Sequence, residues 1–196
     1  MAIEVEFESD AYMSQREFAL WVEGRQRWDP NHYELLNGRI VMNPPAGFPH
    51  GAIDSRLHRL IGPVVDAGHL GWTFGSSQGF DLPSGDTVEP DFSFVSNERW
   101  AQAHPEEGKF IDVAPDLVVE ILSHSTRSRD RGEKKRIYED NGVREYWLVD
   151  PRARTARIFH LRDGRYDTGM LFEFEDVLRS ELLPGLEGPV ADLFPT

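Results

Sequence analysis

The feature that most constrains the fold of this chain is one carboxylate set in an apolar run. Glu120 lies within residues 117–122, and all the remaining residues of this run are Leu, Val or Ile. An uninterrupted apolar run of this length is typical of a strand buried on both faces of a sheet. A buried, unpaired carboxylate costs several kcal/mol, so the fold has to supply a metal, a cation or a proton beside it. The run therefore predicts a central strand with Glu120 as a site residue; structural pairing with an arginine is the alternative.

Length and composition set the outer limits. The chain has 196 residues, 39% of them hydrophobic, and no composition break divides it, so we expect one domain over residues 1–196. No stretch approaches the roughly 20 apolar residues of a membrane span, and the acidic residues 1–10 are unlike the basic start of a signal peptide. We therefore expect a cytoplasmic protein that has no membrane partner.

The charged residues are unevenly distributed. A net charge of −13 opposes indiscriminate binding to nucleic acid, because such binding depends on neutralising phosphates. Positive charge is nevertheless concentrated just after Glu120, at Arg127, Arg129, Arg131, Lys134, Lys135 and Arg136. This segment is interpreted either as a phosphate-binding surface or as a solvated helix face.

Periodicity along the chain predicts an α/β fold. Helical patterns begin at Ser14, which with Glu17 forms a capping-box motif, and cover residues 53–68 and 131–141. Strand patterns cover residues 33–36, 39–42, 72–82, 87–95, 116–122, 145–149 and 155–161. Because Asn37-Gly38 separates the first two strands, they should form an N-terminal β-hairpin. The whole pattern predicts a mixed central β-sheet flanked by α-helices, followed by a tail of short elements.

A second carboxylate, Asp91, stands where another strand begins, and it is expected to converge with Glu120 across neighbouring strands. The chain has no cysteine, so a metal here would sit on oxygen ligands, which favours Mg²⁺ or Mn²⁺. Asp91, Glu120 and the Ile121 carbonyl would suffice for such an ion. Asp91 as a simple turn residue is the alternative.

A lysine near the metal would orient a water or offset charge on a phosphate. Lys134 shares a helical face with Ile137 and Tyr138, at i+3 and i+4, so it is the lysine expected to point inward. An ordinary surface lysine is the alternative.

A long motif runs through this region: PDLVVEILS at 115–123, Ser125-Thr126, DRGEK at 130–134, Tyr138, and GVREYWLVDP at 142–151. Together with YELLNG at 33–38 and Pro90-Asp91, it resembles the Uma-two family of endonucleases, which belongs to the PD-(D/E)XK, restriction-endonuclease-like superfamily. The resemblance covers most of the chain. It implies a restriction-endonuclease-like core and a nuclease that uses Mg²⁺ or Mn²⁺.

Residue by residue, the resemblance implies that Asp91 and Glu120 are the two acidic metal ligands. The superfamily lysine usually stands two residues beyond the second acid, but that place is occupied by Leu122. In this family the lysine has moved to the next helix, which matches Lys134. Spacing and resemblance thus favour the same residue.

The resemblance also implies roles for two N-terminal residues. Glu34 matches an additional glutamate that would bind a metal-bound water or a second cation, and an exposed strand residue is its alternative. His50 matches a position that would contact the scissile phosphate, and a structural histidine at a helix start is the alternative. Arg127, Arg129, Arg131 and His124 are candidate contacts to substrate phosphates.

These residues together predict a metal-dependent endonuclease that hydrolyses phosphodiester bonds in nucleic acid, with DNA as the expected substrate. A homodimer is expected, since many restriction-like nucleases work in pairs. Two other functions stay open. One is a nuclease-fold module that binds without cleaving, and the other is a metal-dependent hydrolase of a different phosphate ester.

Overall fold

A computed structural model describes residues 7–9, 11–25 and 29–195. Its helices are α1 (Gln15–Glu23), α2 (His50–Gly68), α3 (Asn97–Trp100), α4 (Arg127–Arg129), the π-helical turn η1 (Asp130–Lys134), α5 (Lys135–Asp140) and the 3-10 helix η2 (Val190–Leu193). Its strands are β1 (Phe7–Glu8), β2 (His32–Leu36), β3 (Arg39–Asn43), β4 (Gly71–Gly75), β5 (Phe80–Asp81), β6 (Thr87–Val88), β7 (Phe92–Ser96), β8 (Leu117–Ile121), β9 (Glu145–Asp150), β10 (Thr155–Arg162), β11 (Arg165–Tyr166), β12 (Met170–Phe172), β13 (Val177–Arg179) and β14 (Glu187–Pro189). In these described ranges, no helix combines the length and apolar character needed to cross a membrane.

The predicted mixed sheet is confirmed. Within the described residues it has seven strands in the order β11-β10-β9-β8-β7-β4, with β12 also paired to β10. Strand β8 runs antiparallel to β7 and parallel to β9. The apolar run around Glu120 is therefore the central strand that the sequence predicts, and every residue of β8 is buried.

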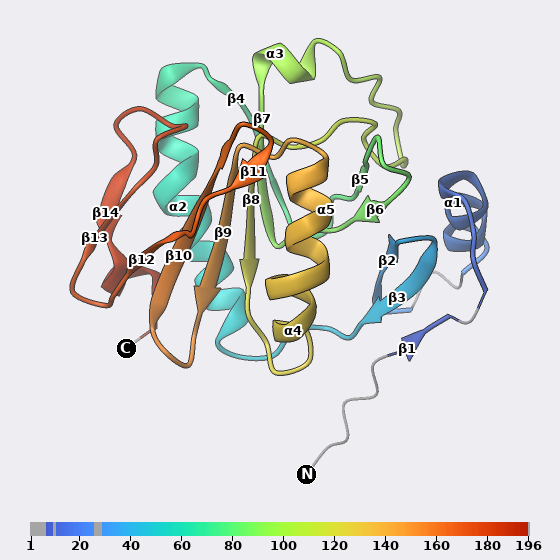
Figure 1. Cartoon of the computed structure of the whole chain (residues 1–196), viewed down its shortest axis with the longest axis horizontal. Coiled ribbons are helices and arrows are strands. Elements are labelled where there is room, and N and C mark those ends of the chain that lie inside the picture. The colour runs from blue at the N-terminus through green and yellow to red at the C-terminus, as the bar shows by residue number, and fades with distance from the viewer. Residues whose placement is uncertain (1–6, 10, 26–28, 196) are drawn as a thin grey trace.

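Helices cover both faces of this sheet, with α5 in front and α2 behind (Figure 1). Because successive strand residues point to opposite faces, Leu117, Val119 and Ile121 pack in the same core as α2, and Val118 packs with Tyr138 of α5. Glu120 shares the period of Val118, so its side chain points to the α5 side. The C-terminal hairpin β13–β14 and η2 complete the core on the α2 side.

The N-terminal hairpin is also confirmed. Strands β2 and β3 pair antiparallel, and the turn residues Asn37 and Gly38 both have positive φ, at 50° and 77°, as a type I′ turn requires. Ser14 caps α1, and the capping box with Glu17 is formed. The hairpin belongs to a second sheet, which in the described residues runs β1-β3-β2-β6-β5.

The two long strands expected at 72–82 and 87–95 are wrong in extent. Each is interrupted, so β4 and β7 join the seven-stranded sheet while β5 and β6 join the second sheet. The residues between β4 and β5 read Ser-Ser-Gln-Gly, and Glu89-Pro90 lies between β6 and β7, where proline has no N–H to donate to a ladder. As a result, Asp91 stands where the chain passes from one sheet to the other.

The helix expected at 131–141 begins earlier and is not uniform. It starts with α4 at Arg127, widens into the π-helical turn η1 at Asp130–Lys134, and continues as α5. The chain leaves the helix at Gly142, whose φ is +73°, in agreement with the expected stop. π-helical turns are frequent at functional sites, and here both Asp130 and Lys134 in the turn are buried.

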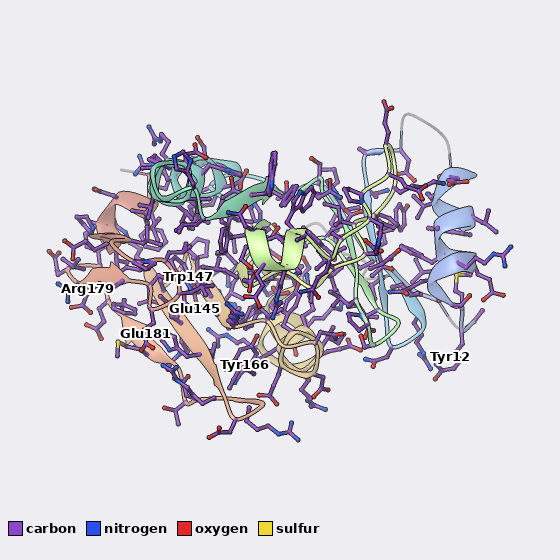
Figure 2. The ribbon with its side chains drawn as sticks, turned by 90° about the horizontal axis from the view of Figure 1, so that it is seen from above. Tyr12, Glu145, Trp147, Tyr166, Arg179 and Glu181 are labelled. Carbon is purple, nitrogen blue, oxygen red and sulfur yellow. The ribbon has the colours of Figure 1, made fainter. Side chains whose placement is uncertain are left out.

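A second buried carboxylate, Glu145 at the start of β9, has a structural role. Its Oε1 accepts hydrogen bonds from the backbone N–H groups of Glu181 and Leu182, and its Oε2 accepts from Trp147 Nε1 and Ser180 Oγ. Figure 2 shows Glu145 and Trp147 on the same side of the molecule as Glu181. The hydrogen bonds of Glu145 therefore link the C-terminal segment to the central sheet.

We expect Glu145→Gln to lower the free energy of unfolding by about 2–4 kcal/mol, since the amide NH₂ would face donors and leave two of them unsatisfied. Urea denaturation followed by circular dichroism measures the change. Glu187→Gln is the matched control, because Glu187 forms only an exposed pair with Arg179, and it should change stability by less than about 1 kcal/mol. Equal effects of the two substitutions would contradict a structural role for Glu145.

Candidate active site

The predicted site residues meet at one edge of the central sheet. The carboxyl ends of the parallel strands β8 and β9 lie at this edge, next to α4 and to the segment that enters α2 (Figure 1). A cleft of about 540 Å³ opens here, and its lining includes Glu34, His50, Asp91, Glu120, Ile121, His124, Arg129 and Lys134. A larger hollow of about 860 Å³, between the start of α1 and the end of α5, contains none of them.

Lys134 is the centre of the site. Its Nζ lies 2.6 Å from Oε1 of Glu120 and 2.8 Å from Oε1 of Glu34, and the residue is only 3% exposed. Lys134 therefore points inward, as its helical spacing predicts, and it is not a surface lysine. The contact joins the second sheet, which carries Glu34, to the central strand and to η1.

Glu120 is paired with this lysine rather than with an arginine. Its Oε1 also accepts a hydrogen bond from the hydroxyl of Tyr138, at 2.6 Å. Burial raises the pKa of Glu120 well above its usual range; Lys134 opposes this shift, and the carboxylates of Asp130, Asp91 and Glu34 add to it. The local structure thus contains more carboxylate charge than one lysine can balance.

The excess of carboxylate charge also affects the pKa of Lys134. Burial disfavours its charge, but Glu120, Glu34 and Asp130 outweigh burial and raise its pKa well above the usual range. Lys134 is therefore a permanent cation at physiological pH. It can hold a proton at Nζ and stabilise negative charge, but it is unsuited to act as a base.

Glu34 is buried at 1% exposure, so the alternative of an exposed strand residue is wrong. Its Oε1 accepts the backbone N–H of Glu89 at 2.9 Å, and its Oε2 accepts Nδ2 of Asn43 at 2.8 Å. These bonds hold its carboxylate against Lys134. Strand β2 therefore contributes a fixed carboxylate to the cleft.

Asp91, which lines the cleft, has two partners. Its Oδ2 accepts the backbone N–H of Ile121 at 2.7 Å, and it lies 3.1 Å from Nε2 of His50. The bond to Ile121 joins Asp91 to the residue after Glu120, and both carboxylates line the same cleft, at the start of β7 and near the end of β8.

His50 is the first residue of α2 and lies against Asp91. Burial lowers the pKa of His50, but the hydrogen bond and charge of Asp91, with Asp54 and Asp130 nearby, raise it above its usual value overall. A protonated His50 would bring a second positive charge to the cleft. The contact favours a site role over a structural histidine at a helix start.

Sequence reasoning missed Asp130, which also lines the cleft and is only 2% exposed. Burial raises the pKa of Asp130 to about 6, with Asp91 and Glu34 adding to the shift against the effect of Lys134. Its position four residues before Lys134 was an available signal, because residues i and i+4 share a helical face. Glu89, whose carboxylate lies 2.8 Å from His32 Nδ1, was missed as well.

The candidate phosphate contacts divide into two groups. Arg129 and His124 line the cleft. Arg127 instead binds Asp150 with two hydrogen bonds of 2.5 and 2.9 Å, and Arg131 lies 3.3 Å from the same carboxylate. Arg152, in the turn after β9, lines the cleft although its sequence position gave no indication of it.

The donor atoms in the cleft suit a hard divalent cation. They are carboxylate and backbone oxygens, and the excess of negative charge around Glu120 favours uptake of a cation. In the described part of the chain, however, no three His, Asp or Glu side chains form a ready metal-binding group. The fit therefore depends on two carboxylates with a backbone carbonyl and water, an arrangement that Mg²⁺ accepts.

Comparison with solved structures agrees with this fold. The chain superposes on a crystal structure described as a "putative nuclease" from Anabaena variabilis ATCC 29413, with a TM-score of 0.73 and 21% sequence identity, over 92% of this chain and 97% of the other. At this identity the match defines the fold, which is restriction-endonuclease-like.

The sequence gives the family. Residues 17–191 match the model of the Uma2 family, described as "Putative restriction endonuclease", and the chain belongs to this family. An uncharacterised protein from Synechocystis sp. (strain ATCC 27184 / PCC 6803 / Kazusa) is 30% identical over 155 residues, which cover 77% of this chain and 75% of the relative. The resemblance noted in the sequence is confirmed.

Proposed function

We propose that this protein is a metal-dependent endonuclease that hydrolyses phosphodiester bonds in nucleic acid, with DNA as the expected substrate. The observation that carries the proposal is the 2.6 Å contact between Lys134 Nζ and Glu120 Oε1. Restriction-like chemistry needs a lysine beside the second acid, and the usual place for it is Leu122 in this chain. Lys134 supplies the missing cation from the next helix.

Asp91, Glu120 and the Ile121 carbonyl would hold one Mg²⁺ or Mn²⁺, with Glu34 or Asp130 available for a bound water or a second ion. When bound, such a cation supplies a Lewis acid that lowers the pKa of water and offsets charge on a phosphate. Among the described residues, Oε1 of Glu120 contacts Tyr138 and Lys134, and Oδ2 of Asp91 accepts the backbone N–H of Ile121. The second oxygen of each carboxylate is the one we assign to the ion.

Three residues of the chain would assist the reaction beside the metal. Lys134 stays protonated and lies where its Nζ can donate to an attacking water or to a phosphate oxygen that gains negative charge. His50, through Nε2, holds Asp91 in place and adds positive charge near the scissile phosphate. Tyr138 fixes the Glu120 carboxylate by its 2.6 Å hydrogen bond.

Substrate phosphates would be met at the rim of the cleft. Arg129 and His124 line it, and we assign them to phosphates on either side of the scissile bond. Arg127 and Arg131 share Asp150, so their charge is partly neutralised. Of these two, Arg131 has the more exposed side chain, at 54%, and it is the better candidate for an outer phosphate contact.

Cleavage of supercoiled plasmid and of single-stranded DNA tests the proposal, each with Mg²⁺, with Mn²⁺ or with EDTA. We expect cleavage with either metal, none with EDTA, and loss of about 10²–10³-fold in rate for Asp91→Asn, the range for removing one preorganised polar group. Leu20→Ala is the control, because Leu20 is exposed on α1. Equal cleavage by Asp91→Asn and the control would contradict the proposal.

The same preparations separate the other two functions. If no nucleic acid is cut but Mn²⁺ binds and Asp91→Asn abolishes that binding, a different phosphate ester is the substrate. If no metal binds and nucleic acid still does, the protein is a binding module without catalysis.

A further inference from the structure

One large apolar side chain stands open at the cleft. Phe48 lies in the segment between β3 and α2, is 85% exposed, and lines the same cleft as Asp91 and Glu120. Figure 1 shows this segment passing along the edge of the sheet, next to the end of β8. A phenylalanine side chain exposed to water lacks the favourable free energy of burial, so contact of the Phe48 ring with an apolar or aromatic group of a ligand would be favourable.

The lining of the cleft combines two kinds of chemistry. The segment that carries Phe48 reads Pro-Pro-Ala-Gly-Phe-Pro at residues 44–49, and its three prolines have no backbone N–H to donate to a phosphate. The segment after β8 contributes Ser123, Ser125, Thr126 and Arg129 to the lining. The first segment therefore suits an apolar ring, and the second, which has hydroxyl and guanidinium groups, suits an anion.

This asymmetry matches a single strand of nucleic acid, which presents bases on one side and phosphates on the other. Proteins that bind such strands combine a cationic track for the backbone with aromatic side chains on which bases stack. Phe48 is two residues before His50, and its Cα therefore lies within about 8 Å of that of His50. Stacked bases are about 3.4 Å apart, so this separation corresponds to about two bases from a phosphate bound beside His50, which contacts Asp91.

We propose that Phe48 stacks on an unpaired nucleobase next to the scissile phosphate, so that the preferred substrate is single-stranded or contains an unpaired stretch. This inference rests on the proposed nuclease function and names the class of its substrate. In a fully paired duplex each base face is covered by its neighbours, and stacking on Phe48 first requires unstacking. Phe48 is therefore a substrate-positioning residue that selects for unpaired bases.

The test measures binding of a short fluorescent oligonucleotide by anisotropy, as a single strand and as a blunt duplex. Ca²⁺ replaces Mg²⁺ to suppress cleavage. We expect Phe48→Ala to weaken single-strand binding by about 5- to 150-fold, which corresponds to the stacking of one base, with little change for the duplex. Phe48→Leu, which keeps an apolar side chain without a ring, should resemble Phe48→Ala, whereas Phe48→Trp should restore binding.

Tyr12→Ala is the matched control, since Tyr12 is an aromatic residue with 71% exposure that does not line the cleft. The inference is overturned if Phe48→Ala binds single strands as the wild type does, or if it weakens single strands and duplex equally. It is also overturned if Phe48→Ala changes only the oligomeric state in light scattering, since the ring would then serve a contact between copies of the chain.

Failure of this inference is distinguishable from failure of the nuclease proposal. The stacking role alone would be refuted if Asp91→Asn abolished cleavage while Phe48→Ala left the KM for single strands unchanged. Phe48-dependent binding of single strands without cleavage in Mg²⁺ or Mn²⁺ would refute the nuclease alone. A wild type that binds no strand would refute both.

Discussion

Replacing Lys134 by methionine should lower the free energy of unfolding by about 3–5 kcal/mol at pH 7, the usual cost of leaving a buried charge without its partner. Lys134 contacts the carboxylates of Glu34 and Glu120 at 2.8 and 2.6 Å, and methionine fills the same space without a charge. Urea denaturation in EDTA measures the loss. Cleavage should also disappear, because Nζ is the cation assigned to the reacting phosphate.

The loss should depend on pH in a stated direction. Burial already raises the pKa of Glu120 well above its ordinary value, and Lys134 is the charge that opposes this rise. Without Lys134 the folded protein therefore binds a proton at higher pH than the unfolded chain does. Stability of the variant should then recover as pH falls from 7 towards 5.

Lys135→Met is the matched control, with the same substitution one residue along the chain. Lys135 is only partly buried and lies over the ring of Phe159 at 3.9 Å, a contact worth about 0.5–1 kcal/mol. If Lys134→Met cost no more than this control, Lys134 would not be balancing buried carboxylates.

Glu120→Gln should separate activity from stability. Glutamine keeps an oxygen for Tyr138 and Lys134, and it removes one negative charge from a cluster with too many. We therefore expect stability within about 1 kcal/mol of the wild type, or above it, as is common when an active-site charge is neutralised. Cleavage should fall by at least about 10²–10³-fold, since a neutral amide is a weaker ligand for the metal than a carboxylate.

Glu145→Gln should have the opposite effect to Glu120→Gln, lowering stability while leaving cleavage unchanged. Both glutamates are buried, in neighbouring strands, but Glu145 accepts its hydrogen bonds from the C-terminal segment and does not line the cleft. At a temperature where the variant is folded, it should cleave at the wild-type rate per molecule while being less stable. A Glu120→Gln variant that retained cleavage would show that the carboxylate serves structure alone.

Local patterns in the sequence were sufficient to predict the main structural elements that position the site. The apolar run around Glu120 predicted a central strand because a segment buried on both faces consists mainly of apolar residues. The Asn37-Gly38 pair predicted the hairpin because few residues adopt positive φ at two adjacent positions. Lys134 was predicted from the i+3 and i+4 spacing of Ile137 and Tyr138, both of which are buried.

Other features depend on contacts distant in sequence. Arg127 is bound by Asp150, 23 residues away, and no local pattern distinguishes it from Arg129, which lines the cleft. Asp130 is buried in the π-helical turn, which has no recognisable sequence signal, so only its i, i+4 spacing to Lys134 pointed to the cleft. The division of residues 72–95 between two sheets depends on which strands pair, and strand propensity alone does not determine this.

Titration of Mn²⁺ into the metal-free protein by calorimetry tests the central claim, that Asp91 and Glu120 form a metal centre beside Lys134. The wild type should bind the ion, Asp91→Asn should bind it more than about 100-fold more weakly, and Glu145→Gln should bind it as the wild type does. Equal Mn²⁺ affinity for the wild type and Asp91→Asn would contradict the claim.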